Sequence, residues 1–330
     1  MTNRIVLLVT SPRLPAGLLS AAAWDVVRAH PVLTAAESEQ TAALRAAGAT
    51  VTVVGERPAQ ALLDAAAEHG TVVWLAGPGG DEELARELGL RLAQQPGLAE
   101  LELLYGSWDP PGARLLDAVA VMDRLVSPGG DPWKREQTHA TLAPFLLEEA
   151  YEAYDAIVAG DLDALREELG DVLLQVVLHA RLAEELPGDR QWSVDDVAAG
   201  LVEKMIRRNP HVFAGEEVQT VEEITENWER IKRAEKARGS AMDGIALAQP
   251  ALSLAAKILA RATRAGVVPP LPPAPAGLGE VRPESAESLG AALLALVARA
   301  REAGLDAEAA LRQAALAYAD AVRAAERSTD

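Results

Sequence analysis

Leu147-Glu148-Glu149-Ala150-Tyr151-Glu152 and Glu167-Glu168-Leu169-Gly170-Asp171 are the two stretches that decide the fold of this chain. In the first stretch, Glu149 and Glu152 are spaced i, i+3, which places them on one face of a helix. The second stretch repeats this spacing with Glu168 and Asp171. The pattern therefore predicts two helices, each with an acidic pair on one face.

The residues between the two stretches predict where the chain turns. Gly160 is typical of a helix end, because glycine adopts the left-handed backbone conformation found there. Asp161 or Asp163 can then cap the following helix with a side-chain carboxylate. Two helices joined by so short a connection run antiparallel. The sequence thus predicts a helical hairpin.

Counting from Gly160 gives the register of this hairpin. Glu152 and Glu168 each lie eight residues from Gly160, whereas Glu149 and Asp171 each lie eleven residues away. At a rise of ~1.5 Å per residue, the inner pair lies roughly 12 Å from the turn and the outer pair roughly 16 Å. We therefore expect the four carboxylates to form two facing rungs.

Apolar residues surround these acids on both helices. The expected stripes are Leu142, Leu146, Ala153 and Ile157 on the first helix, and Leu165, Leu169, Val172 and Val176 on the second. Four like charges near a core cost several kcal/mol unless something neutralises them. No Arg stands at the matching positions, and ligation by oxygen atoms alone suits Mg²⁺, with Mn²⁺ as a substitute. The absence of nearby His ligands disfavours zinc.

Two other interpretations stay open at this point. An ordinary pair of acidic helices with solvated faces would need no metal. A ferritin-like di-iron site would use Glu-x-x-His, whereas Asp171 stands three residues after Glu168. His179 lies two turns beyond Asp171, and we interpret it as helix packing or substrate-side polarity rather than as a ligand.

Composition limits the function further. The chain has 330 residues, and 31 basic against 49 acidic side chains give a net charge of −18, which argues against nucleic-acid polymers and anionic membranes as partners. Without cysteine there are no disulfides, thiolate metal sites or cysteine nucleophiles. The apolar run at the amino terminus is too short for a signal peptide, and no stretch of about 20 apolar residues occurs. We expect a cytoplasmic protein that does not enter a membrane.

The rest of the chain is organised around this hairpin. Short apolar or β-branched runs at 4–9, 50–54 and 71–75, and a further expected strand at 101–105, alternate with helical stretches near 35–47, 58–69 and 81–95. Helices are expected at 113–126, 138–158, 162–186, 194–208 and 220–238. We therefore predict a mainly α chain: a small α/β domain over 1–110, a helical domain over 113–265, a Pro-rich linker over 266–283 and a helical segment over 284–330.

Basic residues in the middle of the chain suggest an anionic substrate. All five lysines lie between 134 and 257. Lys204 and Arg208 are spaced i, i+4, as are Trp228 and Lys232. Each pair alone is typical of a solvated helix surface, but beside a metal site they suggest a nucleotide pocket in which cations hold a triphosphate and a Trp stacks. The chain lacks the Gly-x-x-x-x-Gly-Lys-Ser/Thr loop of P-loop enzymes.

Together these motifs carry a family resemblance. Besides the two acidic stretches, the matching text is Asp131-Pro132-Trp133-Lys134-Arg135-Glu136-Gln137-Thr138-His139, Arg207-Arg208-Asn209-Pro210-His211-Val212-Phe213 and Trp228-Glu229-Arg230-Ile231-Lys232. Residues 113–260 resemble the MazG family of nucleoside triphosphate pyrophosphohydrolases. Two departures, Asp131 in place of the family's usual Cys and Lys134 in place of Asp, lie in the loop before the first acidic helix and leave the metal site untouched.

The resemblance implies an all-α catalytic domain that hydrolyses NTP or dNTP to NMP and pyrophosphate and clears unwanted nucleotides. It implies Mg²⁺ ligation by Glu149, Glu152, Glu168 and Asp171, with Glu148 as an additional acid that either supports these ligands from outside the metal site or orients water. It implies substrate contacts by Trp133, Lys204, Arg208, Trp228 and Lys232, and a homodimer. A non-catalytic nucleotide-binding helical regulator and an oxygen-active di-metal bundle remain the alternatives.

Two flanking regions look like degenerate modules. Ser288-Leu289-Gly290-Ala291-Ala292-Leu293-Leu294 echoes Glu168–Leu174 with both acids lost, which suggests a second copy that binds no metal or an accidental Ala/Leu similarity. The first 110 residues faintly resemble the leading half of tetrapyrrole methylase domains. The loop Ser11-Pro12-Arg13-Leu14-Pro15 lacks their glycines, and Gly77-Pro78-Gly79-Gly80-Asp81 suits a simple turn, so we expect no methyl transfer.

Overall fold

The protein is described here by a computed structural model. It describes residues 3–78, 80–95, 97–215, 220–235, 240–272 and 285–327, without the side chains of residues 229, 232–234, 325 and 326. The chain forms two compact units, Met1–Leu201 and Val202–Asp330, and each is described by itself. Most of the expected linker over 266–283 lies outside the described residues.

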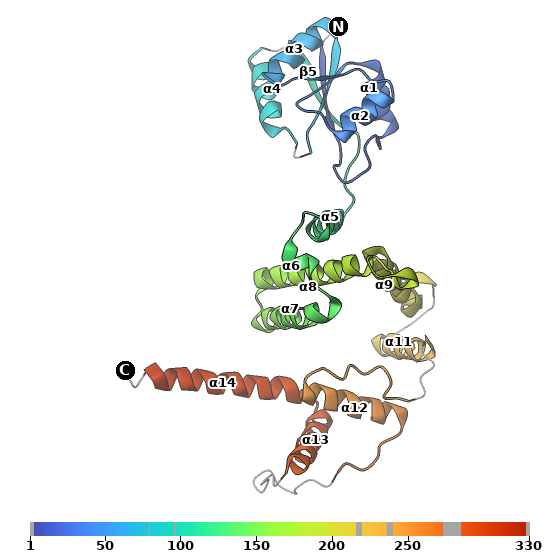
Figure 1. Ribbon diagram of the computed structural model, residues 1–330, viewed down its shortest axis with the longest axis vertical. Helices are drawn as coiled ribbons and strands as arrows, with labels where there is room; N and C mark the ends of the chain where they lie inside the picture. Colours follow the sequence, from blue (N-terminus) through green and yellow to red (C-terminus); the bar gives the residue numbers. More distant parts are fainter. Residues whose placement is uncertain are drawn as a thin grey trace. The chain divides into compact units, whose positions relative to one another are not determined.

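A parallel sheet with helices on both faces forms the amino-terminal part of the first unit (Figure 1). Its strands are β1 (Arg4–Val9), β2 (Val32–Thr34), β3 (Val51–Val53), β4 (Thr71–Leu75) and β5 (Glu100–Tyr105), in the order β3-β2-β4-β1-β5. Its helices are α1 (Ala21–Ala29), α2 (Glu39–Ala46), α3 (Pro58–His69) and α4 (Glu82–Gln94). The four expected strands and three expected helical stretches are present, but β2 and α1 were not predicted.

Alternating residues of the strands build two separate cores. Ile5 and Trp74 pack on the face covered by α3 and α4, whereas Val6 and Val73 pack on the face covered by α1 and α2. Because both faces are buried, the strands read as continuous apolar runs, as is typical of parallel sheets between helices. This confirms the small α/β fold expected from the sequence.

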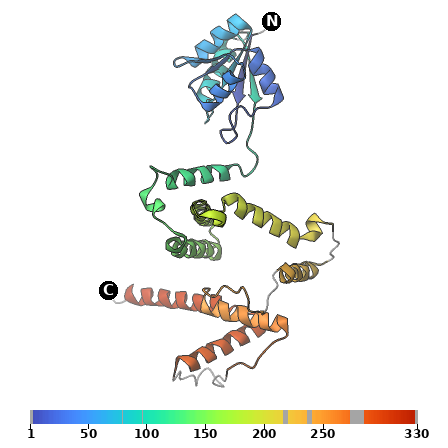
Figure 2. The same ribbon diagram turned by 45° about the vertical axis from the view of Figure 1, so that its right-hand side comes forward.

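Helices alone form the rest of the first unit. They are α5 (Arg114–Val126), α6 (Pro132–Arg135), α7 (His139–Ala159), α8 (Leu162–Ala183) and the first part of α9 (Val194–Arg208). The α7 and α8 helices lie side by side as an antiparallel hairpin (Figures 1 and 2). The side of α8 that carries Val177 and Leu178 packs against Met122 and Val126 of α5, with Leu142 of α7 in the same core.

The turn of the hairpin follows the predicted chemistry. Gly160 ends α7 with φ at 71°, a left-handed conformation that glycine adopts at little cost. The Asp161 carboxylate then accepts hydrogen bonds from the backbone N–H groups of Asp163 and Ala164, which caps α8. The predicted helical hairpin is therefore confirmed, with Asp161 rather than Asp163 as the cap.

The second unit is also helical. It holds the end of α9 together with α10 (Pro210–Phe213), α11 (Val221–Glu235), α12 (Ala251–Ala265), α13 (Ala286–Glu302) and α14 (Ala307–Arg327). The last three helices pack against one another (Figure 1), and α12 was not predicted as a separate helix. Ser288, the counterpart of Glu168 in the suggested second copy, pairs with Ser285 in a capping box at the start of α13. The repeat itself stays a prediction.

Helix is the dominant structure of the described residues, which confirms the mainly α class. Within the described part of the chain, no helix combines the length and apolar character that a membrane crossing would need.

Candidate functional site

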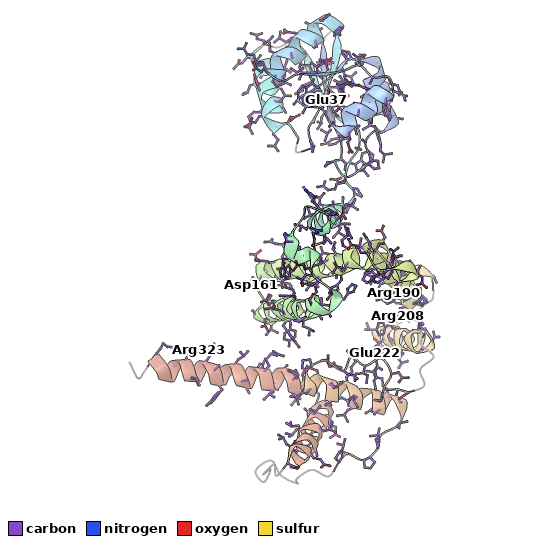
Figure 3. The ribbon with its side chains drawn as sticks, viewed as in Figure 1. Glu37, Asp161, Arg190, Arg208, Glu222 and Arg323 are labelled. Atoms are coloured by element: carbon purple, nitrogen blue, oxygen red, sulfur yellow. The ribbon has the colours of Figure 1, made fainter. Side chains whose placement is uncertain are left out.

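The facing sides of α7 and α8 bring three carboxylates together. One oxygen from each of Glu149, Glu152 and Glu168 lies within 4.8 Å of the others. Glu149 and Glu168 are partly buried, and Glu152 is exposed. Figure 3 shows this pair of helices with Asp161 labelled at the turn. Three of the four inward-facing acids expected from the sequence thus converge on one place in the hairpin, and Asp171 lies outside this group.

Electrostatics within the cluster follows the predicted rungs. Burial raises the pKa of Glu149 above its usual value, and the Asp171 charge raises it further, ahead of the other acids. Burial also raises the pKa of Glu168, and there the Glu152 charge is the next largest cause. Among the charged neighbours, the acid on the other helix thus has the largest effect on the pKa of each group. This pattern agrees with Glu152 facing Glu168 and Glu149 facing Asp171.

Nothing cationic compensates these charges among the described side chains. No Lys or Arg there forms an ion pair with Glu149, Glu152 or Glu168, nor with Asp171, whose carboxylate lies outside the three-oxygen group. Four nearby carboxylates with only oxygen donors fit a hard divalent cation, because such cations prefer oxygen ligands and offset like charges. The residues present therefore fit a metal of the Mg²⁺ type.

The apolar stripes are only half buried in the single chain. Leu142 and Ala153 are buried, as expected. Leu146, Ile157 and Leu169, however, are 37%, 59% and 53% exposed, so the expectation of a core around the whole cluster is corrected. The reason is that α5 covers one side of the hairpin, and no described part of the first unit covers the opposite side.

Asp131 and Lys134, the two departures from the family pattern, contact each other in the segment before α7. The Asp131 carboxylate accepts a hydrogen bond from the backbone N–H of Trp133 at 2.9 Å and caps α6. Its second oxygen lies 3.1 Å from Nζ of Lys134, and this ammonium group lowers the pKa of Asp131. The two unusual residues therefore neutralise each other.

Trp133 in the same loop lies close to the cluster. Its ring meets that of Phe145 edge-on at a centroid distance of 5.8 Å, and Phe145 is one helical turn before Glu149. The Trp133 side chain is half exposed. Of the expected substrate contacts, Trp133 is the one that the structure places beside the acidic hairpin.

The remaining expected substrate residues belong to the second unit. Arg208 (labelled in Figure 3) is one of them. It forms an ion pair with Glu235 at 2.6 Å, and its guanidinium carbon lies 5.2 Å from the centroid of Trp228. Arg207 also contacts Glu235, at 2.7 Å. These two guanidinium groups lower the pKa of Glu235 to about 2. Lys204 on α9 is partly buried, and the Lys232 side chain lies outside the described residues.

A pair of histidines at the open end of the hairpin was not predicted. Nδ1 of His139 lies 2.7 Å from Nδ1 of His179, and the two rings stack at a centroid distance of 5.1 Å. Trp192 also stacks on His139, at a centroid distance of 6.1 Å. Counting from Gly160 places both residues near the open end of the hairpin, since His139 lies 21 residues before it and His179 lies 19 after it, but it does not set them at equal distances from the turn.

Comparisons with known proteins relate the acidic hairpin to a described protein family. A family model for the MazG nucleotide pyrophosphohydrolase domain matches residues 137–213, which include the whole acidic hairpin. A solved MazG-related protein from Thermotoga maritima is 27% identical, with a TM-score of 0.31, over 36% of this chain and 97% of its own.

Curated relatives extend the similarity beyond the hairpin. The nucleoside triphosphate pyrophosphohydrolase of Escherichia coli K12 is 40% identical over 59% of this chain and 81% of its own length. The protein of the same name from Mycolicibacterium smegmatis is 45% identical over 69% of this chain, which spans 64% of that relative. An uncharacterised 26.1 kDa protein from Streptomyces cacaoi is 47% identical over 76% of this chain and 96% of its own. The chain therefore belongs to the MazG family of nucleotide pyrophosphohydrolases.

Proposed function

We propose that this protein hydrolyses nucleoside triphosphates to the monophosphate and pyrophosphate with the help of Mg²⁺. The observation that carries the proposal is the convergence of three carboxylates within 4.8 Å without a cationic partner among the described residues. The relatives named nucleoside triphosphate pyrophosphohydrolase support the same activity. Clearing unwanted nucleotides in the cytoplasm is the role that fits it.

Four side chains of the hairpin would hold the metal. Glu149, Glu152 and Glu168 provide the converging oxygens, and Asp171 is the nearby fourth ligand. When bound, the cation polarises the α-phosphate and stabilises the pyrophosphate that leaves. Glu148, next to this group on α7 and exposed, is assigned to orienting the attacking water. No covalent intermediate is needed, because position and electrostatics supply the catalysis.

Basic and aromatic side chains would bind the rest of the nucleotide. We assign Lys204, Arg208 and Lys232 to the phosphates, because cations there offset the charge that develops in the reaction. Trp228 and Trp133 offer aromatic faces for the nucleoside. The Trp133 assignment draws support from its contact with Phe145, one turn from Glu149.

We propose in addition that the protein is a homodimer that covers the open side of the hairpin. Leu146, Ile157 and Leu169 leave this side apolar and exposed in the single chain. Exposed apolar surface of this kind is typical of a protein interface. A self-complementary contact of two hairpins would bury it, and sedimentation of the purified protein at several concentrations tests this.

The activity is tested by product analysis. The protein is incubated with each common NTP and dNTP in the presence of Mg²⁺, and the products are separated by ion-exchange chromatography. We expect NMP and pyrophosphate in equal amounts. Release of NDP and orthophosphate would refute the proposal.

Substitution of the acids separates the enzyme from its alternatives. Glu152→Gln combined with Glu168→Gln is expected to abolish turnover and leave the helical content unchanged. A regulator without catalysis would show no turnover in the wild-type protein. Tightly held iron in the purified protein would instead favour an oxygen-active di-metal bundle.

A further inference from the structure

Contacts at both ends hold the acidic hairpin of α7 and α8 together. At one end the chain itself joins α7 and α8 through Gly160. At the other end, His139 and His179 meet with their Nδ1 atoms 2.7 Å apart and their rings nearly parallel, at 5°. We call these two residues the histidine pair. The carboxylate rungs lie between the two ends, roughly 12 and 16 Å from the turn, whereas the histidine pair lies roughly 30 Å from it.

The acids between these ends push the helices apart. Glu149, Glu152 and Glu168 each bring one carboxylate oxygen within 4.8 Å of the others, so their charged forms repel one another. Repulsion across two antiparallel helices acts against the contacts far from the turn, where the Leu142 and Leu178 core and the histidine pair hold α7 and α8 together. A restraint at the open end therefore opposes the separation where it is needed.

The histidine pair has the chemistry of such a restraint. Two nitrogens at 2.7 Å can share one proton, so one ring donates and the other accepts. Burial, followed by the neighbouring His139, lowers the pKa of His179, which keeps that ring neutral. Trp192 stacks on His139 at 6.1 Å, and both histidines are partly buried. A shielded hydrogen bond holds two helices more firmly than an exposed one.

We propose that His139 and His179 are positioning residues that hold α7 and α8 at the spacing required for the carboxylates to share one metal ion. The proposal rests on the metal site of the proposed function. Neither histidine belongs to the group of carboxylates that would hold the metal. Their contribution is to place Glu149 and Asp171, the outer rung, within ligand distance of the inner rung.

Manganese binding tests the proposal directly. Mn²⁺ affinity is measured by electron paramagnetic resonance at a temperature well below unfolding, without nucleotide, so turnover plays no part. We expect His179→Ala and His139→Ala each to weaken Mn²⁺ binding by about tenfold. The double variant His139→Asn with His179→Asn is expected to restore most of the affinity, because one amide can donate to the other.

A matched control removes the effect of stability alone. Met122→Ala cuts into the core that α5 shares with Leu142 and Leu178 but leaves the histidine pair in place, so its Mn²⁺ affinity measures the effect of lost packing alone. If the histidine variants weaken binding no more than Met122→Ala does, or if the double Asn variant fails to restore it, the positioning role is wrong.

Helix spacing gives a second, independent measurement. The chain has no cysteine, so Ala140→Cys on α7 and Val176→Cys on α8 provide the only two thiols for spin labels. Labelled protein is diluted with unlabelled protein, which removes distances between two copies. We expect the metal-free distance to lengthen and broaden in His179→Ala. An unchanged distance would overturn the proposal, whereas failure of the wild-type protein to bind Mn²⁺ would overturn the metal site itself.

Discussion

Glu152 on α7 and Glu168 on α8 lie opposite each other, eight residues on either side of Gly160, and the Glu152 charge raises the pKa of Glu168. Two acids that oppose each other in this way destabilise the metal-free fold. The arrangement is tolerable for a protein that works with a cation bound, because the cation turns the repulsion into ligation. Stability and function therefore compete at this rung.

This competition predicts a characteristic pH dependence. The folded state holds protons at Glu149 and Glu168 more tightly than the unfolded chain does, because their folded pKa values are raised. In EDTA, the free energy of unfolding should therefore increase as the pH falls from 7 and these two groups bind protons. The gain should be lost again as the pH rises through their folded pKa values. Mg²⁺ at about 100 times its Kd adds about 2.7 kcal/mol at pH 7. Differential scanning calorimetry with and without Mg²⁺ measures both effects.

The variant Glu168→Gln checks that the acids cause this behaviour. It should melt at a higher temperature than the wild-type protein in EDTA at pH 7 and gain nothing from Mg²⁺. Glu203→Gln, an exposed acid on α9, serves as the control and should keep the Mg²⁺ effect. A metal-free Glu168→Gln protein that is less stable than the wild type would contradict the account.

Two glycines of the hairpin should respond to the same substitution with opposite signs. Gly160→Ala forces a side chain into the left-handed conformation at φ 71° and should cost about 1 kcal/mol. Gly170→Ala lies inside α8, where an added Cβ meets nothing within 4 Å, and should add about 0.5–1 kcal/mol. Urea unfolding of both variants measures the difference. Equal shifts would show that the turn does not need Gly160.

Two leucines of α7 differ in burial, so their substitution by Ala should have different effects on stability. Leu142 is 1% exposed and packs with Met122 and Leu178, so Leu142→Ala should cost about 2–5 kcal/mol through lost burial and a cavity. Leu147 is 52% exposed, and Leu147→Ala should stay within about 0.5 kcal/mol in the monomer. Chemical unfolding at low protein concentration checks both values. A large loss in Leu147→Ala would place that side chain in an interface.

The helical hairpin could be predicted because its signals are local. The i, i+3 acids define a helix face, Gly160 marks the turn, and counting from the turn sets the register. Two helices joined by a short connection leave one arrangement, so the facing acids follow without knowledge of the rest of the fold. The site therefore needed only short-range information.

What the sequence could not show depends on contacts between distant residues. The strand β2 is three residues long, and its pairing with β3 and β4 is what makes it a strand. Leu146 was expected to be buried but is exposed, because no other element of the described residues covers it in the single chain. The periodicity of the sequence identifies an apolar helix face but not the element that packs against it. Likewise, Arg208 looked like a free phosphate contact until the structure showed its ion pair with Glu235.

The ion pair between Arg208 and Glu235 should stabilise the fold at neutral pH. Arg208 and then Arg207 lower the pKa of Glu235 to about 2, so the folded protein binds a proton there less tightly than the unfolded chain. The stability from this group is fully present above the ordinary carboxyl pKa and is lost as the pH falls toward 2. Glu235→Gln should therefore lower the melting temperature at pH 7. It should also make the melting temperature fall less steeply as the pH is lowered into the acid range.

The same substitution, Glu235→Gln, should also raise the KM for nucleotide, because Arg208 loses the partner that holds it against Trp228. Glu226→Gln on the same helix is the matched control and should change neither the melting temperature nor the KM, and an unchanged KM in Glu235→Gln would show that Arg208 takes no part in binding.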